Sequence, residues 1–229
     1  FHWFCGTHYN QNPSGWNGFT TLASFYDKFE TVDQRRGVAY PGFTANTGMR
    51  VGFLEGQQYG AGGVALKDRG GNPLIFTRDV SNIVTGSVLE TAGIRVVKYV
   101  PDMKENWSGS QDNANNDYVM LRYADVLLMK AEALLRTGNA ADALIIVNQI
   151  RAIRGATAFT SLNLDNLLDE RGRELYWESW RRNDLIRFGH FLDAVGTTRP
   201  SKSDNKYLLF PIPANALAAN PALGQNPGY

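Results

Sequence analysis

The chain has 229 residues, of which 43% are hydrophobic and 20% charged, as is typical of a folded globular protein. Its 23 basic and 22 acidic residues leave a net charge of +1, so the sequence lacks the basic excess that a protein needs when nucleic acid is its main partner. No apolar run approaches the roughly 18 residues that a membrane-spanning helix requires.

The start of the chain shows no targeting segment. It has no initiator Met, no charged region and no apolar signal core, and Phe1–Phe4 lacks the small residues that precede a lipoprotein cysteine. We therefore expect a piece of a longer protein, with any membrane attachment through a lipid anchor outside this chain. Cys5 is the only cysteine, which excludes an internal disulfide and a cysteine-based zinc cluster and predicts a lone structural thiol.

Residues 1–116 are rich in Gly, Asn and aromatic side chains and poor in helical periodicity. The turn formers within Tyr9–Gly18 exclude a regular helix or strand there. A helix is predicted over about Thr21–Glu30, because four large apolar residues share one face, and a strand over Ile94–Val100, which Pro101 ends. The composition predicts a loop-rich region with a few short strands.

Residues 117–229 are predicted to be mainly helical, so the fold class is mainly α. Asp117 is the expected N-cap of a helix through Tyr118–Thr137 that ends at Gly138. A second helix is expected over Ala140–Ile153, and the short connection predicts an antiparallel hairpin similar to one tetratricopeptide unit. Further helices are predicted from Asp165 through Trp177 or beyond and near Arg181–Leu192, followed by an extended or turning tail, Tyr207–Tyr229.

Glu170, Glu174 and Glu178 lie four residues apart and would form one row along the third predicted helix. A pair of carboxylates is the equipment of a glycoside hydrolase. The apolar neighbours instead predict burial, and buried carboxylates need cationic partners, which also lower a carboxylate pKa. We therefore expect a structural ion-pair network. The candidate partners are Arg122, Arg171, Arg173, Arg181, Arg182 and Arg187.

Four blocks in chain order resemble the signatures of the SusD/RagB family. They are Arg122-Tyr123-Ala124-Asp125-Val126-Leu127-Leu128 with Ala131-Glu132-Ala133; Asn148, Arg151 and Arg154; Glu170-Arg171, Glu174-Leu175, Glu178, Arg181, Asp184-Leu185 and Arg187; and Pro211-Ile212-Pro213 with Gln225-Asn226-Pro227-Gly228-Tyr229. One departure is Ser179, where the family often has Gly; it is expected to affect only a local helix position.

The resemblance implies a non-catalytic nutrient-binding protein of the Bacteroidetes cell surface, lipid-anchored in the outer membrane. Such proteins bind a glycan or another small nutrient and deliver it to a SusC-like, TonB-dependent transporter. It also implies that tetratricopeptide-like helices from the first half of the parent protein lie outside this chain, and that the matched motif residues are framework. No binding residue is carried over from the family.

The ligand-binding residues are therefore predicted from physical chemistry. Flat aromatic rings cover the C–H face of a sugar, while amides and charged groups bind its hydroxyls. We expect this surface within residues 1–116. The first-rank candidates are Trp3, Tyr9, Asn10, Asn12, Trp16 and Asn17, with Gln11 beside them. Tyr59, next to Gln57 and Gln58, and Trp107, next to Asn106, are second-rank candidates. Packing of any of these rings onto the scaffold is the alternative.

No cofactor or metal is predicted. Three scattered histidines do not form a metal-site pattern, Gly60–Ala65 lacks the strand and helix of a dinucleotide site, and Asp112–Asp117 lacks the glycine of a calcium loop. Two other functions stay open beside nutrient binding: a helical-repeat scaffold for protein interactions, and a glycoside hydrolase using Glu170 and Glu174.

Overall fold

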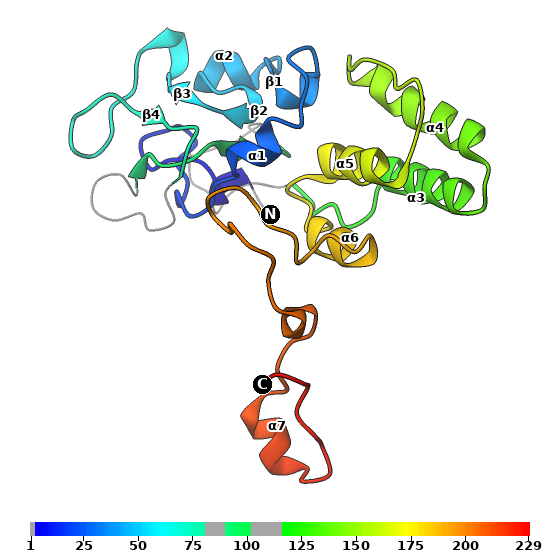
Figure 1. Cartoon of the computed structure of the whole chain (residues 1–229). Coiled ribbons are helices and arrows are strands. Elements are labelled where there is room, and N and C mark those ends of the chain that lie inside the picture. Colours follow the sequence, from blue (N-terminus) through cyan, green and yellow to red (C-terminus); the bar gives the residue numbers. More distant parts are fainter. Residues whose placement is uncertain (1–2, 81–89, 102–115) are drawn as a thin grey trace. The chain divides into compact units, whose positions relative to one another are not determined.

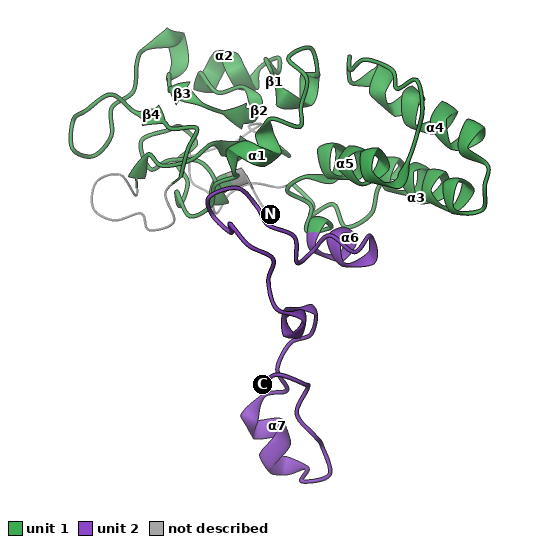
Figure 2. Cartoon of the chain, viewed as in Figure 1, with its two compact units in different colours: residues 1–181 green, residues 182–229 purple. Residues whose placement is uncertain are grey.

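The computed structural model describes residues 3–80, 90–101 and 116–229. The chain divides into two compact units, residues 1–181 and 182–229 (Figure 2). The compositional boundary at residue 117 falls inside unit 1. Cys5 is buried and not in a disulfide, in agreement with the structural thiol that the sequence predicts.

The helical part of unit 1 consists of α3 (Tyr123–Arg136), α4 (Ala140–Ile153) and α5 (Leu164–Leu175). Figure 1 shows α3 and α4 as a hairpin with α5 beside α3, which confirms the predicted mainly helical, tetratricopeptide-like class. Ala131 and Ala143 are fully buried, so the two helices can approach closely. Their shared core contains Leu128, Ala131, Ala143, Ile146, Val147, Ile150, Leu162 and Leu167.

The ends of these helices follow local sequence signals only in part. α4 has the predicted bounds, and Gly138, with φ +88°, ends α3 as expected. The prediction that Asp117 caps α3 is wrong. The helix begins at Tyr123. Arg122, which precedes it, has an extended backbone (φ −147°, ψ 159°), and its side chain makes no capping hydrogen bond. Arg122 instead directs its guanidinium to Glu174 and Glu178, which keeps the preceding residues outside the helix.

α5 starts with a reciprocal cap between Asn163 and Asn166 and stops at Leu175, two residues before the predicted end. Tyr176 is extended, and Trp177 and Ser179 have left-handed φ values of +66° and +67°. The sequence suggested that Ser179 is a helix position, and this prediction is wrong. Its backbone lies in the region that glycine adopts most easily, which accounts for the glycine that the resemblance places there.

The loop-rich part of unit 1 contains two small antiparallel sheets. In the first, β2 (Val51–Leu54) lies between β1 (Gly37–Val38) and β5 (Arg95–Val97), with Gly52 opposite both Gly37 and Val97. In the second, β3 (Gly56–Gln57) pairs with β4 (Ile75–Phe76). The strand predicted over 94–100 is thus shorter, because Ile94 makes only an isolated bridge to Thr21 and pairing ends at Val97.

Aromatic packing joins these sheets to the helices. α1 (Ala23–Tyr26) is a single turn rather than the predicted ten-residue helix, yet Tyr26 and Phe29 are buried as its pattern required. Phe29 and Tyr176 both contact Phe53 of β2, with ring centroids 4.9 Å apart in each case. α2 (Phe43–Thr47) covers a second apolar cluster around Leu74. The short 3-10 turns are Trp3–Cys5, Gln34–Arg36 and Ala61–Gly63.

Helix α6 (Arg181–Arg187) leads into unit 2, which also contains a 3-10 turn, Asn205–Leu208, and α7 (Ala214–Ala219). The prediction of a tail without helix is therefore wrong at α7, where an alanine-rich run follows Pro213. The two motifs near the end of the chain, Pro211–Pro213 and Gln225–Tyr229, are hydrogen-bonded to each other. Ile212 N–H donates to Oε1 of Gln225 (2.8 Å), and Nε2 of Gln225 donates back to the Ile212 carbonyl (3.0 Å).

Candidate functional site

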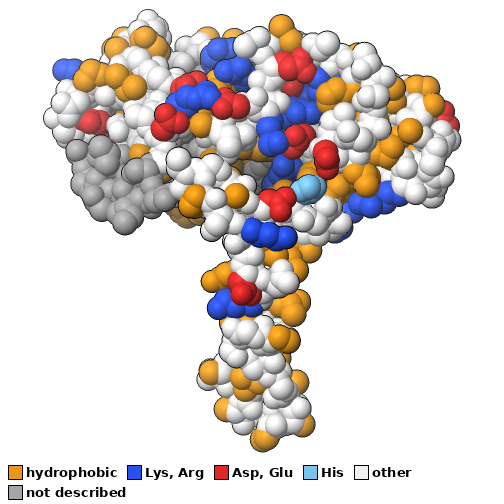
Figure 3. Space-filling view, viewed as in Figure 1, with side chains coloured by type: hydrophobic (Ala, Val, Ile, Leu, Met, Phe, Trp, Pro, Cys, Tyr) orange, Lys and Arg blue, Asp and Glu red, His pale blue; other side chains and the backbone are white. Residues whose placement is uncertain are grey.

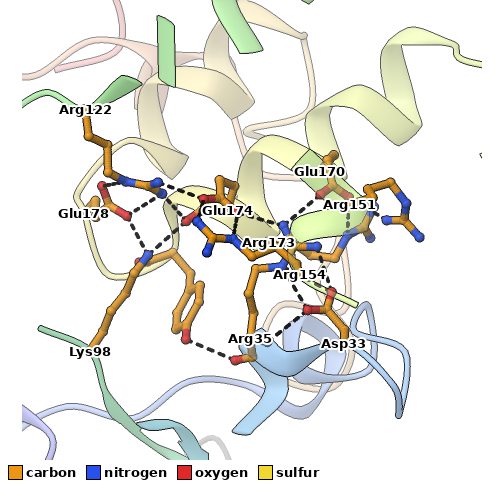
Figure 4. Close-up of polar contacts among 11 residues, drawn as sticks. Asp33, Arg35, Lys98, Arg122, Arg151, Arg154, Glu170, Arg173, Glu174 and Glu178 are labelled. Carbon is orange, nitrogen blue, oxygen red and sulfur yellow. Dashed lines mark hydrogen bonds and ion pairs between the residues drawn. The ribbon is translucent and has the colours of Figure 1, made fainter. Parts of the chain in front are cut away.

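The carboxylates that suggested catalysis lie in a buried network of ion pairs (Figure 4). We call the following residues the guanidinium network: Asp33, Arg35, Lys98, Arg122, Arg151, Arg154, Glu170, Arg173, Glu174 and Glu178. The side chain of Glu170 has no exposed surface. It contacts three guanidinium groups, those of Arg35 at 2.7 Å, Arg151 at 2.6 Å and Arg173 at 2.8 Å.

Glu174 is bound in the same way, one turn along α5. Arg154 lies 2.6 Å, Arg122 2.7 Å and Arg35 2.9 Å from its oxygens. Burial opposes its ionisation, but the hydrogen bonds from Arg154 and Arg122 outweigh that effect and lower the pKa of Glu174 to about 2. Glu178 lies beyond the end of α5, so the single helical row that the sequence suggested does not extend to it; it pairs with Arg122 and Lys98.

This arrangement is unsuited to proton transfer. A general acid near neutral pH needs a carboxyl group whose pKa is raised by burial or by a neighbouring carboxylate. The pKa of Glu174 and that of Glu178 are both lowered, in each case because hydrogen bonds from cationic side chains overcome desolvation. The guanidinium network instead has a structural role. Arg35 of the loop-rich part binds Glu170 and Glu174 of α5, so the network holds that part of unit 1 to the helices.

Apart from Trp3, the first-rank binding candidates lie on a compact loop, residues 4–19, which we call the aromatic loop. Its shape depends on backbone hydrogen bonds from Trp16 N–H to the Phe4 carbonyl (2.8 Å) and from Asn17 N–H to the Thr7 carbonyl (2.9 Å). Gly15 is essential to this turn, because a Cβ there would lie 1.9 Å from Oγ1 of Thr7 and 2.4 Å from the Phe4 carbonyl oxygen.

Three rings of the aromatic loop are open to solvent, those of Trp16, Tyr9 and Phe19, the last of which is 44% exposed. Trp16 is 54% exposed and meets Phe4 edge-on with centroids 4.4 Å apart; Tyr9 is 40% exposed and lies under the guanidinium of Arg69, 4.4 Å from its centroid. Rings that are held on one side and exposed on the other can stack on a sugar without further ordering.

The predicted amides divide into two groups. Asn10 and Asn12 are exposed, and Nδ2 of Asn10 donates to the Lys67 carbonyl (2.8 Å). Asn17 is tied into the framework, because Nδ2 donates to the Glu90 carbonyl (2.8 Å) and Oδ1 accepts from Nε of Arg95 (3.0 Å). Trp107 and the side chain of Trp3 lie outside the part of the chain that the structure describes.

Two buried residues that were not among the predicted site residues, His8 and Arg95, hold the loop in place. His8 is buried; its Nδ1 accepts from Asn10 N–H (3.0 Å), which places the proton of the neutral ring on Nε2, facing Glu90 at 2.8 Å. Arg95 is also buried and donates to the carbonyls of Ala92, Gly93 and Glu90. Because these partners are more than seventy residues from the loop in sequence, no local pattern predicts them.

Lowering the pH below 6.5 is expected to destabilise the aromatic loop. Desolvation, together with the charges of Arg95 and Arg69, holds the pKa of His8 below its usual 6.5, although Glu90 opposes this shift; Asp68 is the other charged neighbour. The unfolded chain therefore binds this proton at a higher pH than the folded chain does. The contribution of His8 to stability is complete above pH 6.5 and decreases as the pH falls towards the lower folded-state value.

Urea unfolding between pH 7.5 and 5.0 measures this effect. His8→Gln should show a smaller loss of unfolding free energy over that range than the unmodified protein. Gly18→Ala, which changes the same loop without removing a titratable group, should retain the original dependence. Equal pH dependence in the protein with and without His8 would show that this histidine does not act as described.

Tyr59 lies apart from the aromatic loop, at a separate pocket of about 390 Å³ that we call the Tyr59 pocket. Its ring is 46% exposed. Gln58 links the two regions, since its Oε1 accepts from Nε2 of Gln11 (3.4 Å). The lining residues are Tyr26, Thr31, Arg36, Gly37, Gly48, Arg50, Phe53, Leu54, Glu55, Gln57, Gln58 and Tyr59.

A further pocket, of about 310 Å³, is lined in part by the guanidinium network, including Arg35, Arg154 and Glu174. On the face of unit 1 seen in Figure 3, Lys and Arg side chains alternate with Asp and Glu side chains instead of forming one extended charged area. Among the described residues, no three His, Cys, Asp or Glu side chains are grouped so that they could hold a metal ion. Within the same ranges, no helix combines the length and apolar character needed to span a membrane.

Comparison with known proteins gives a consistent result. A model of the SusD family matches residues 4–229. SusD-like protein P38 of Formosa agariphila is 34% identical over 149 residues, which are 59% of this chain and 28% of that protein. The starch-binding protein SusD of Bacteroides thetaiotaomicron is 33% identical over 126 residues, which are 50% of this chain and 22% of that protein.

Solved structures show the same fold. A SusD-like protein of Bacteroides fragilis superimposes with a TM-score of 0.65 at 22% identity, over 99% of this chain and 51% of its own. Surface glycan-binding protein A of Bacteroides thetaiotaomicron, solved in complex with laminarihexaose, gives a TM-score of 0.54 at 20% identity, over 98% of this chain and 44% of its own. The chain thus spans about half the length of these solved proteins and about a quarter of the curated relatives.

Proposed function

Because the chain belongs to the SusD family, we propose that the protein binds a glycan, or another small nutrient, without altering it and delivers it to a SusC-like, TonB-dependent transporter. The observation that carries this proposal is the aromatic loop. It presents Tyr9 and Trp16 to solvent on a hydrogen-bonded framework. The names of two similar proteins, one a starch-binding protein and one solved with laminarihexaose, support a glycan as ligand.

The chemistry of the loop fits a sugar. Trp16 and Tyr9 offer ring faces for the C–H surface of a pyranose, and the exposed amides of Asn10 and Asn12 can exchange hydrogen bonds with its hydroxyls. Asn17 contributes indirectly by fixing the loop to Glu90 and Arg95. Trp3, Tyr59 and Trp107 remain candidate contacts.

The guanidinium network supports a non-catalytic role. Each oxygen of Glu174 accepts from at least one guanidinium group, so neither is available as a proton donor. In this proposal the protein acts on the outer face of the outer membrane, with a lipid anchor outside this chain. The transporter would receive the glycan directly from it.

The α3 surface favours a second candidate, a helical scaffold that binds protein. Tyr123, Val126 and Met129 are spaced along one side of α3 and are 74%, 50% and 46% exposed. Apolar strips of this kind usually pack against another chain segment or protein. The scaffold function would gain support if Tyr123→Ser abolished binding of a purified protein partner while Trp16→Ala left that binding unchanged.

Trp16→Ala is expected to weaken glycan binding at least tenfold, because it removes the most exposed ring of the aromatic loop. The full-length protein is first screened on a glycan array, and the strongest oligosaccharide is then titrated by calorimetry. Tyr40→Ala is the matched control, since Tyr40 is 51% exposed but lies outside the loop. Unchanged affinity in Trp16→Ala, or an equal loss in both variants, would contradict the assignment of the loop.

A further inference from the structure

Two arginines of the Tyr59 pocket differ from the arginines of the guanidinium network. Arg36 and Arg50 line this pocket, yet neither forms an ion pair with any carboxylate among residues 3–80, 90–101 and 116–229. Glu55 is the only acidic residue in the lining, and its side chain is exposed. Arg35 does not line this pocket, and its guanidinium is bound to Asp33, Glu170 and Glu174. Adjacent arginines therefore serve different purposes.

Both guanidinium groups are positioned by the fold. Arg36 lies over the ring of Tyr26, 4.4 Å from its centroid, and directly precedes β1. Arg50 directly precedes β2 and donates from Nη2 to the carbonyl of Gly37. The antiparallel pairing of β1 with β2 thus brings the two cations to one pocket. Side chains held in this way lose little conformational entropy when a ligand binds.

The aromatic wall of the pocket is fixed by a close backbone approach. Gly48 has φ +74°, and a Cβ at this position would lie 2.4 Å from the carbonyl oxygen of Tyr59 and 2.3 Å from that of Gly60. Only glycine permits this contact, which holds the half-exposed Tyr59 ring at the pocket. The pocket therefore combines a ring face with two cationic groups that have no carboxylate partner of their own.

We propose that the Tyr59 pocket binds an anionic sugar residue, a hexuronate or a sulfated hexose, within the glycan. The inference rests on the proposed glycan-binding function and specifies its ligand class. A guanidinium fork matches the geometry of a carboxylate or sulfate, and two such forks favour an acidic over a neutral ring. The volume of about 390 Å³ is within the range of small-molecule sites.

The test is a set of calorimetric titrations of the full-length protein at constant ionic strength. The probes are glucuronate, glucose 6-sulfate, glucose and inorganic sulfate. We expect at least one of the two anionic sugars to bind at least tenfold more tightly than both glucose and inorganic sulfate. Arg36→Gln and Arg50→Gln should each weaken that binding at least tenfold. Tyr59→Ala should weaken it too, and Lys130→Gln, which removes an exposed positive charge on α3, should leave it unchanged.

The outcomes separate this inference from the proposed function. If neutral oligosaccharides bind through Trp16 while glucuronate and glucose 6-sulfate bind no better than glucose, the pocket assignment is wrong and the glycan-binding proposal stands. Binding of bare sulfate as tight as that of the anionic sugars would overturn recognition of a sugar ring. If no glycan of any kind binds, this inference fails, and so does the proposal that the nutrient is a glycan. Thermal unfolding of each variant checks that the pocket remains folded.

Discussion

Replacing Glu170 with glutamine is expected to lower the free energy of unfolding by about 3–5 kcal/mol. Three guanidinium groups converge on this carboxylate, and the side chains of Glu170 and Arg151 are both at most 1% exposed. The substitution conserves shape but removes a negative charge that three buried or nearly buried guanidinium groups share, at a side chain with no exposed surface. Urea unfolding of the full-length protein measures the change.

Asp169→Asn is the matched control on the same helix. Asp169 pairs with Lys28 and Arg181, but its side chain is 28% exposed, so the expected loss is at most about 1 kcal/mol. A Glu170→Gln variant as stable as Asp169→Asn would show that the guanidinium network does not hold the helices to the loop-rich part of unit 1.

Gly15→Ala is expected to abolish measurable glycan binding. The added methyl group would collide with the carbonyl oxygens of Phe4 and Thr7, at 2.4 and 2.5 Å. These two carbonyls accept the hydrogen bonds from Trp16 and Asn17, so the loop must open to relieve the collision. The cost in stability should be about 1–3 kcal/mol, and calorimetry with the oligosaccharide that the array selects measures the binding.

Gly18→Ala provides the comparison within the same loop. Its nearest neighbour would be the Cys5 carbonyl oxygen at 3.7 Å, an ordinary van der Waals contact, so this variant should bind as the unmodified protein does. If Gly15→Ala binds equally well, the conformation of the aromatic loop is not what presents Trp16 to the ligand.

The sequence predicted the helical hairpin well, because α3 and α4 are defined by local signals. Apolar periodicity marks the buried faces of both helices, and Gly138 ends the first of them. Where tertiary contacts override local preference, the prediction failed. Arg122 is drawn to Glu174 and Glu178, so the helix that follows starts later than its apolar pattern suggests. At α1, aromatic packing against Phe53 replaces most of the expected helix.

The ion-pair network was predicted in kind, but its members were only partly identified. Arg122 and Arg173 bind the carboxylates as expected, whereas Arg171 pairs with Asp125 and Arg181 with Asp169. Arg35 was not predicted, because it lies 135 residues from Glu170 and only the folded chain brings them together. The candidate site shows the same division: composition indicated the aromatic loop, while His8 and Arg95 required the fold.

Recovery of the ligand after a saturating titration tests the central claim most directly. The full-length protein is titrated with the oligosaccharide that binds it best, and the sugar is then separated and its chain length measured. We predict saturable binding with every oligosaccharide recovered at its original length. Shorter products, formed by the unmodified protein and absent with Glu174→Gln, would contradict the account.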